Sequence, residues 1–120
     1  MTDRGSAAVE FALLVPLVIV VLVGVVEVAV AARAQLQVSH AAREGAREAA
    51  TAPDPERAIA VVKTVLGPEL AAGARVVVER DHRIGGRADV AVTAPHRVAG
   101  ALLGGFTVTL RGSASMRVER

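Results

Sequence analysis

The sequence predicts an α+β protein with a long N-terminal transmembrane helix, a second short helix and a small antiparallel sheet of about three strands. Three patterns indicate this architecture. An apolar stretch without charge runs from Phe11 to Val26, and a helical repeat of small residues follows it. After Ala74, apolar and polar residues alternate with a period of two, which is typical of strands with one covered and one solvated face.

The uncharged stretch is the candidate membrane anchor. A helix over residues 11–26 is about 24 Å long, and with its apolar flanks it approaches the ~20 residues that a membrane span needs. Glu27 follows the stretch, and Glu10 precedes it with apolar residues on both sides. An ionisable residue within a span costs roughly 2.5–3.5 kcal/mol on insertion scales. Glu10 is therefore the first candidate functional residue.

Pro16 lies within the apolar stretch and predicts a mild helix kink, because proline removes a backbone donor. Local melting of the helix on a change of environment is an alternative interpretation. The whole stretch has a rival interpretation as the h-region of an ordinary signal peptide, cleaved at Ala29-Val30-Ala31. Against this, the stretch exceeds the usual ~7–15 residues of an h-region, and Glu10 is badly placed in one. A single-pass anchored accessory protein is a further alternative.

The segment Arg4-Gly5-Ser6-Ala7-Ala8-Val9-Glu10-Phe11, followed by an apolar helix, resembles the leader and helix start of type IV prepilins. Together with Pro16 and the later Ala/Arg/Glu-rich stretch, it is similar to the TadE-like group of the tight-adherence (Flp) pilus systems. Met116-Arg117-Val118-Glu119 is also similar to that group, though less specifically. Two departures from the major pilins, Phe11 in place of tyrosine and a much longer chain, favour a pseudopilin or minor pilin.

This resemblance implies cleavage by a prepilin peptidase between Gly5 and Ser6, and subunit docking through Glu10 and Phe11. The new α-amine of Ser6 would be cationic, and an opposite charge within roughly 4–6 Å stabilises a carboxylate in a low dielectric. Assembly would then pair the amine of one subunit with Glu10 of its neighbour, two groups that are costly when unpaired. The alternative is that Glu10 only extends to the membrane interface.

The helix is expected to continue beyond the membrane. If it is unbroken from Ser6 to Ala50, it is about 68 Å long, which exceeds any bilayer. Small residues recur on one face of its second part, at Val38, Ala41, Ala42, Gly45, Ala46 and Ala49. Packing of this face on the chain's own sheet is the favoured interpretation, and a filament contact is the alternative.

A proline-rich break, Thr51-Ala52-Pro53-Asp54-Pro55, precedes the second helix. Asp54 is expected to cap that helix, with Pro55 at its first position, and Gly67-Pro68 to end it. Its apolar stripe is expected at Ile59, Val62 and Val65/Leu66. The predicted organisation is a leader at 1–5, a transmembrane and stalk helix at 6–50, and a small extracytoplasmic α+β domain at 51–120.

The alternation predicts strands at Ala74–Arg80, Arg87–Ala94 and Phe106–Glu119. In the last strand, the even-numbered residues are expected to face the core. Asp81–Gly86 reads as a hairpin loop, and Gly112 predicts a bulge or bend. In Pro95–Gly105, Leu102-Leu103 is either a loop packed on the core, which is favoured, or an exposed patch.

Composition narrows the function class. The chain has no cysteine, 2% aromatic residues and a net charge of +2, which disfavours thiol chemistry and nucleic-acid binding. It contains no nucleophile elbow, P-loop or dinucleotide fingerprint, and His40, His82 and His96 lack ligand-like spacing. We expect no enzyme activity, cofactor, metal site or small-molecule substrate. The expected partners are the membrane, a prepilin peptidase, other pilins and pilus-assembly proteins.

The expected location is the cytoplasmic membrane, with the C-terminal domain outside the cytoplasm. Arg33, Arg43 and Arg47 follow the apolar stretch and would favour the opposite orientation by the positive-inside rule. That rule is set aside here because long translocated domains largely ignore it.

Overall fold

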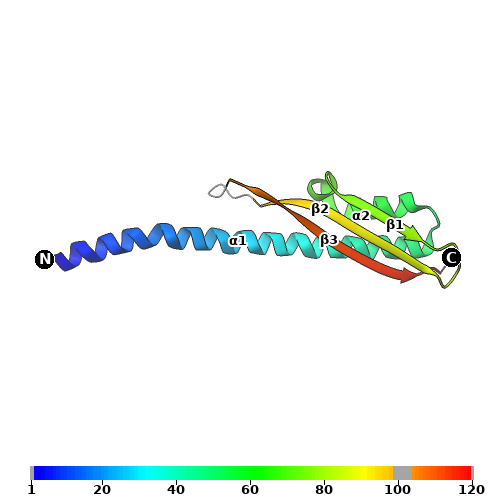
Figure 1. Ribbon diagram of the computed structural model, residues 1–120, viewed down its shortest axis with the longest axis horizontal. Helices are drawn as coiled ribbons and strands as arrows, with labels where there is room; N and C mark the ends of the chain where they lie inside the picture. The colour runs from blue at the N-terminus through cyan, green and yellow to red at the C-terminus, as the bar shows by residue number, and fades with distance from the viewer. Residues whose placement is uncertain (1, 99–103, 120) are drawn as a thin grey trace. The chain divides into compact units, whose positions relative to one another are not determined.

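The computed structural model describes residues 2–98 and 104–119 (Figure 1). Its elements are α1 (Thr2–Thr51), α2 (Pro55–Ala71), β1 (Arg75–Arg80), β2 (Arg87–Val98) and β3 (Phe106–Arg117). The predicted α+β class is confirmed, with a long apolar N-terminal helix, a second helix and a 3-stranded antiparallel sheet. The chain forms two compact units, Met1–Val30 and Ala31–Arg120.

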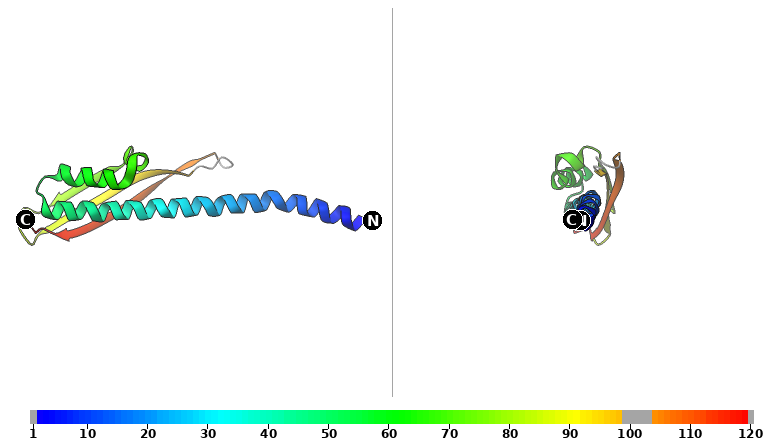
Figure 2. Two further views of the ribbon diagram at one scale, coloured as in Figure 1. Left: turned by 180° about the vertical axis from the view of Figure 1, so that it is seen from behind. Right: turned by 90° about the vertical axis from the view of Figure 1, so that its left-hand side faces the viewer.

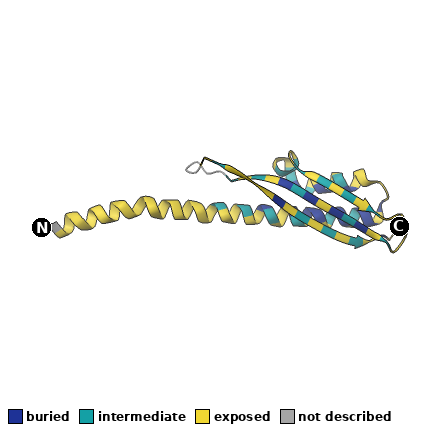
Figure 3. Cartoon of the chain, in the orientation of Figure 1, coloured by how far each residue is buried: buried dark blue, intermediate teal, exposed yellow. Residues whose placement is uncertain are grey.

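The second unit has a layer of helix packed on one face of the sheet (Figure 2, right-hand view). The small-residue face of α1 supplies much of its core, and Figure 3 shows where burial begins along the helix. The buried residues of this face are Ala34, Val38, Ala41, Ala42, Gly45, Ala46, Ala49 and Ala50. Packing of this face within the chain's own domain is therefore confirmed, and small side chains allow close approach of the backbones.

Gly45 lies where α1 meets both α2 and the sheet. A Cβ atom built on Gly45 would lie 2.5 Å from Val62 Cγ2 of α2 and 3.2 Å from Val90 Cγ1 of β2. Val62 and Val90 are only 0% and 1% exposed, so neither has free space to move into. The absence of a side chain at position 45 thus sets how closely α1 packs.

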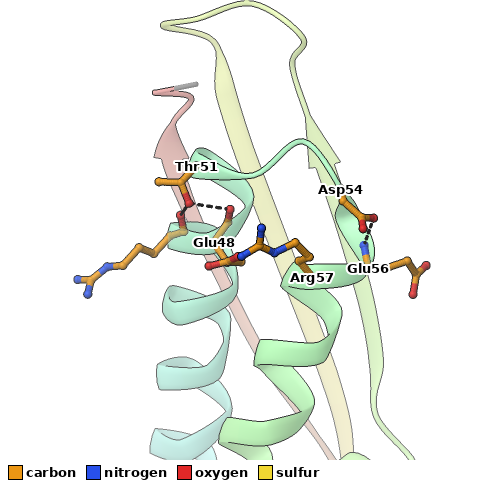
Figure 4. Close-up of polar contacts among 6 residues, drawn as sticks. Glu48, Thr51, Asp54, Glu56 and Arg57 are labelled. Atoms are coloured by element: carbon orange, nitrogen blue, oxygen red, sulfur yellow. Dashed lines mark hydrogen bonds and ion pairs between the residues drawn. The ribbon is translucent and has the colours of Figure 1, made fainter.

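The connection from α1 to α2 has the predicted capping (Figure 4). The Glu56 N–H donates to Asp54 Oδ1 at 3.0 Å, and Pro55 occupies the start of α2. Arg57 Nη2 lies 2.9 Å from Glu48 Oε1 and joins the two helices by an ion pair. At the end of α1, the Thr51 hydroxyl donates to the carbonyls of Arg47 and Glu48.

The predicted apolar stripe of α2 needs one correction. The buried residues are Ala58, Val62 and Leu66, and Ile59 is only half-buried. The i, i+4, i+8 row that faces the core therefore runs one residue earlier than Ile59. The regular helix does stop at Gly67-Pro68, as predicted. Gly67 has φ 79° and interrupts the helical backbone, and a further turn then runs to Ala71.

The sheet has the order β1-β2-β3, with neighbouring strands antiparallel. The three predicted strands are confirmed, with β2 longer than expected by four residues up to Val98. The hairpin loop at Asp81–Gly86 is also present. Its Asp81 Oδ2 accepts a hydrogen bond from the Arg87 N–H at 3.0 Å, and Gly85 adopts φ 85°.

Of the bulge or bend predicted at Gly112, the bulge is wrong. The β2–β3 register is continuous, and Val92 pairs directly with Gly112. A Cβ atom built there would lie 3.0 Å from the Val38 carbonyl oxygen and 3.1 Å from Ser39 Cα. Glycine at this position serves the close approach of α1 to β3, which is the other reason for a glycine within a strand.

The core-facing row of β3 is covered only in part. Leu110 and Val118 are buried, but Phe106 and Val108 are 54% and 38% exposed. The expectation that this whole row faces the core is therefore wrong at the N-terminal end of β3. The interpretation of Leu102-Leu103 falls in 99–103, outside the described residues.

Candidate functional site

All five predicted site residues lie in the first unit, on α1. Gly5 and Ser6 stand at the expected processing position, Glu10 and Phe11 at the expected docking position, and Pro16 at the expected kink. Each is helical and exposed. Residues with high helix propensity surround them, which accounts for the regular helix over this segment.

Gly5 carries no requirement for glycine within the chain. A Cβ atom built on it would meet nothing within 4 Å, and its backbone is helical. Glycine in a helix interior costs about 1 kcal/mol relative to alanine. Neither packing nor backbone conformation among the described residues compensates this cost, so the fold of this chain gives no reason for glycine here.

Glu10 lies one helical turn after Ser6. Residues at i and i+4 occupy the same face, and helical side chains lean toward the N-terminus. The Glu10 carboxylate is thus directed toward the turn that holds Ser6. The Glu10 side chain is exposed and makes no hydrogen bond or ion pair with residues 2–98 or 104–119. It is available to a cationic group of another molecule.

The surface that follows Glu10 is apolar all round the helix. From Phe11 to Val26 no residue is charged, and the large side chains Val, Leu and Ile are exposed throughout. An 18-residue window of this helix is strongly apolar with none of it buried. A helix that is apolar on every side is matched to the core of a membrane, and this one is long and apolar enough to cross it.

Phe11 and Pro16 lie within the first turns of this apolar surface. Phe11, the single aromatic residue in the sequence of the first unit, is 69% exposed. The helix assignment continues without interruption through Pro16. The docking role of Phe11 and the kink at Pro16 remain predictions.

The three histidines lie on different elements of the chain. His40 is on α1, His82 in the β1–β2 loop and His96 on β2. No group of three or more potential metal-binding side chains occurs within the described ranges. At the start of α1, by contrast, Glu10 and the apolar surface that follows it can form an ion pair and apolar contacts with another molecule.

The structure also assembles charged residues that the sequence had not singled out. Arg75, Glu79, Asp89 and Arg111 all lie on the uncovered face of the sheet, on three different strands. Arg75, Glu79 and Arg111 are exposed, and Asp89 is half-buried. Only the strand register shows which of them are neighbours.

Comparison with known proteins supports the assignment of the N-terminal region. Residues 5–47 match a family model described as TadE-like protein. The matched segment begins at Gly5 and contains all the predicted site residues. No curated protein and no solved structure gives a significant match. The resemblance that the N-terminal motif predicted is confirmed.

Proposed function

We propose that this TadE-like chain is a pseudopilin or minor pilin that takes part in assembly of a tight-adherence pilus, where it docks to other subunits through the start of α1. The family match indicates involvement in such a pilus system. The finer role is supported by one observation. An unpaired, exposed Glu10 immediately precedes a helix surface that is apolar on all sides, one turn after a glycine–serine junction.

The first step in this proposal is removal of the leader, residues 1–5. A prepilin peptidase cuts the peptide bond after Gly5 and leaves Ser6 as the new N-terminus. The remaining helix stays in the cytoplasmic membrane, with the unit Ala31–Arg120 outside the cytoplasm. The lack of any packing role for Gly5 supports recognition of this residue by the peptidase.

The second step is docking. The α-amine of Ser6 is cationic once released, since such amines have a pKa near ~7.7–8.0. Ser6 and Glu10 are separated along the helix axis by about 6 Å. A neighbouring subunit displaced by about one turn therefore brings its amine level with Glu10. The two charges are then paired in a low-dielectric environment, where each is costly alone. Phe11 adds apolar contact beside the pair.

The mass of the mature N-terminus tests the first step. We expect a chain that begins at Ser6 when the protein is expressed with its cognate peptidase. Gly5→Leu should leave the chain uncut. The matched control is Gly24→Leu, because a Cβ atom at either glycine meets nothing within 4 Å. A wild-type chain that retains Met1 would instead favour an anchored accessory protein.

One structural observation favours the rival secretion hypothesis. The boundary between the two compact units falls between Val30 and Ala31, within the possible cleavage sequence Ala29-Val30-Ala31. A signal peptidase cut there would leave most of the second unit intact. A mature chain that begins just after Ala31 or Ala34 would establish secretion in place of the pilin role.

The docking step is tested by Glu10→Ala against Glu27→Ala, a second acid on the same helix. We expect Glu10→Ala to abolish co-purification with other pilus subunits and to lower the number of pili, while its mature N-terminus is still Ser6. Glu27→Ala should behave as the wild type because Glu27 lies at the other end of the apolar stretch. Normal piliation with Glu10→Ala would disprove the docking role.

A further inference from the structure

The uncovered face of the sheet carries its side chains in rows across the three strands. The register places Val77, Ala91 and Ser113 in one row. On one side of it lie Glu79, Asp89 and Ser115, and on the other side lie Arg75, Thr93 and Arg111. Consecutive rows on one face are about 6.8 Å apart along the strands. An acidic row and a basic row therefore flank a central row of small or apolar residues at equal distances.

The central and acidic rows line a shallow depression that is open to solvent. Its volume is about 430 Å³, and its lining includes Val77, Glu79, Asp89, Ala91, Ser113 and Ser115. Val77 is 46% exposed here, whereas Val76 and Val78, its neighbours along β1 on the opposite face, are half-buried. The small side chains leave room for another surface to approach the backbone of the sheet.

The acidic and basic rows make no ion pairs with the described residues. Glu79 pairs directly with Asp89 across β1 and β2, and like charges directly opposite each other are destabilising. Neither carboxylate makes an ion pair with any residue in 2–98 or 104–119, and the same holds for Arg75 and Arg111. Arg87 and Arg117 form the next row on this face, and Arg87 Nε donates to Ser115 of the acidic row at 3.4 Å, but neither arginine forms an ion pair with Glu79 or Asp89. The two carboxylates therefore remain without an ion-pair partner among the described residues.

We propose that this face docks on the same face of a second copy of the chain. A two-fold axis along the row Val77–Ala91–Ser113 exchanges the acidic and basic rows. It places Glu79 opposite Arg75 of the second copy, and the symmetric pair forms at the same time. Asp89 comes to lie opposite Thr93 of the second copy, between Arg75 and Arg111 of that copy.

This geometry agrees with general sheet packing. Sheets pack face to face at about 10 Å with strand directions nearly aligned, and a central row of small residues permits that distance. The reversed strand direction that the axis imposes is compatible with aligned packing. The proposal concerns only residues of the second unit, so it does not depend on the pilin role or on Glu10.

Cross-linking through an introduced cysteine tests whether the partner is a second copy. Full-length chains that carry Ala91→Cys are treated in detergent micelles with a short bifunctional thiol reagent. The chain has no cysteine of its own, so every cross-link reports this position. Ala91 lies on the proposed axis, and we expect efficient dimer formation. Ala60→Cys, an exposed alanine on α2, is the matched control and should not cross-link.

Added to Ala91→Cys, Glu79→Arg or Arg75→Glu alone should lower the cross-linked yield roughly tenfold, because each places like charges opposite each other. An equal mixture of the two variants should restore the yield, because every contact in the mixed dimer is then between opposite charges. The double variant should also associate with itself. Circular dichroism should be unchanged in all of them, which excludes unfolding as the cause.

The mixture is the decisive measurement. Recovery of the cross-link in the mixed sample, and not in either variant alone, would establish a self-complementary interface. Failure of Ala91→Cys to cross-link would overturn the proposal. Loss in both single variants without recovery in the mixture would also overturn it and would assign the face to a different partner.

Discussion

The two stretches of α1 differ in what their glycines meet. At Gly5 and Gly24, in the unit Met1–Val30, a Cβ atom would meet nothing within 4 Å. At Gly45, in the second unit, it would lie 2.5 Å from Val62 Cγ2. One helix therefore carries glycines that this chain's own packing does not need and a glycine that it requires. The difference separates glycines that the packing of this chain leaves free to vary from a glycine that its core requires.

The larger side chains follow the same division. The first stretch is rich in Val, Leu and Ile, and these are exposed on every side. The second stretch presents mostly alanine to the core, with charged residues on its other face. A lipid environment favours large apolar side chains around a helix, whereas close packing on a sheet favours small ones on a single face. Apolar composition alone does not distinguish the two; side-chain size and the placement of charges do.

The largest expected effect is that of Gly45→Leu. The new side chain must displace Val62 and Val90, both in the tightly packed core, and overpacking typically costs 1–3 kcal/mol and occasionally more. We expect a loss of about 3 kcal/mol or more in the free energy of unfolding of the second unit. Urea denaturation monitored by pulse proteolysis of the full-length chain in detergent would measure it. Gly24→Leu is the control and should leave this stability unchanged. Equal free energies of unfolding for Gly45→Leu and Gly24→Leu would contradict the difference between the two stretches.

A smaller effect is expected for Gly112→Ala. The added methyl group would contact the backbone of α1 at Val38 and Ser39, which cannot move as a side chain does. We expect a destabilisation of about 1–3 kcal/mol, measured as above. Gly24→Ala provides the control with the same change in an open position. An unchanged or increased free energy of unfolding would show that β3 and α1 can move apart at no cost in stability.

Gln37 joins the second stretch of α1 to the end of the regular part of α2. Its Nε2 donates to the carbonyl oxygens of Leu66 at 2.8 Å and Val65 at 3.1 Å, just before Gly67 interrupts the helix. Gln37→Ala should lower the free energy of unfolding by about 1 kcal/mol, because a net hydrogen bond contributes about this much. Leu36→Ala, an exposed neighbour, is the control and should have a smaller effect.

The smallest expected effect is that of the Glu48–Arg57 ion pair. The Arg57 side chain is 65% exposed, and an exposed pair contributes only about 0.2–1 kcal/mol. A double-mutant cycle with Glu48→Gln and Arg57→Gln should give a coupling in this range that decreases as salt is added. A coupling well above it would show that the contact between α1 and α2 depends on charge more than on the alanine face.

Much of the architecture was predictable because local patterns specified it. The apolar stretch, the Asp54 cap and the alternation in β3 each depend on residues close in sequence, and the structure contains the corresponding helix, cap and strand. The small-residue face was also correctly interpreted, since alanine and glycine at helical spacing have few uses other than close packing. The motif from Gly5 to Phe11 led to the family that the comparison supports.

The errors arose where one element meets another. The sequence predicts a bulge or bend at Gly112, but a glycine in a strand can also serve the close approach of another backbone, and only the position of α1 distinguishes these explanations. Ile59 was expected in the core because the stripe of α2 admits two phases one residue apart. Phe106 and Val108 continue the alternation of β3, yet the face that they share with Leu110 is left uncovered there.

The sequence by itself determined the type and order of the elements and the membrane-compatible helix. It also identified Gly5, Ser6 and Glu10 as candidate residues. Each of these depends on residues that are neighbours along the chain. Only the tertiary structure decided why Gly45 and Gly112 are glycines, which row of α2 faces the core, and which charges are neighbours on the open sheet face. Those features depend on contacts between residues distant in sequence, and one-residue changes of phase or register alter them without changing any local pattern.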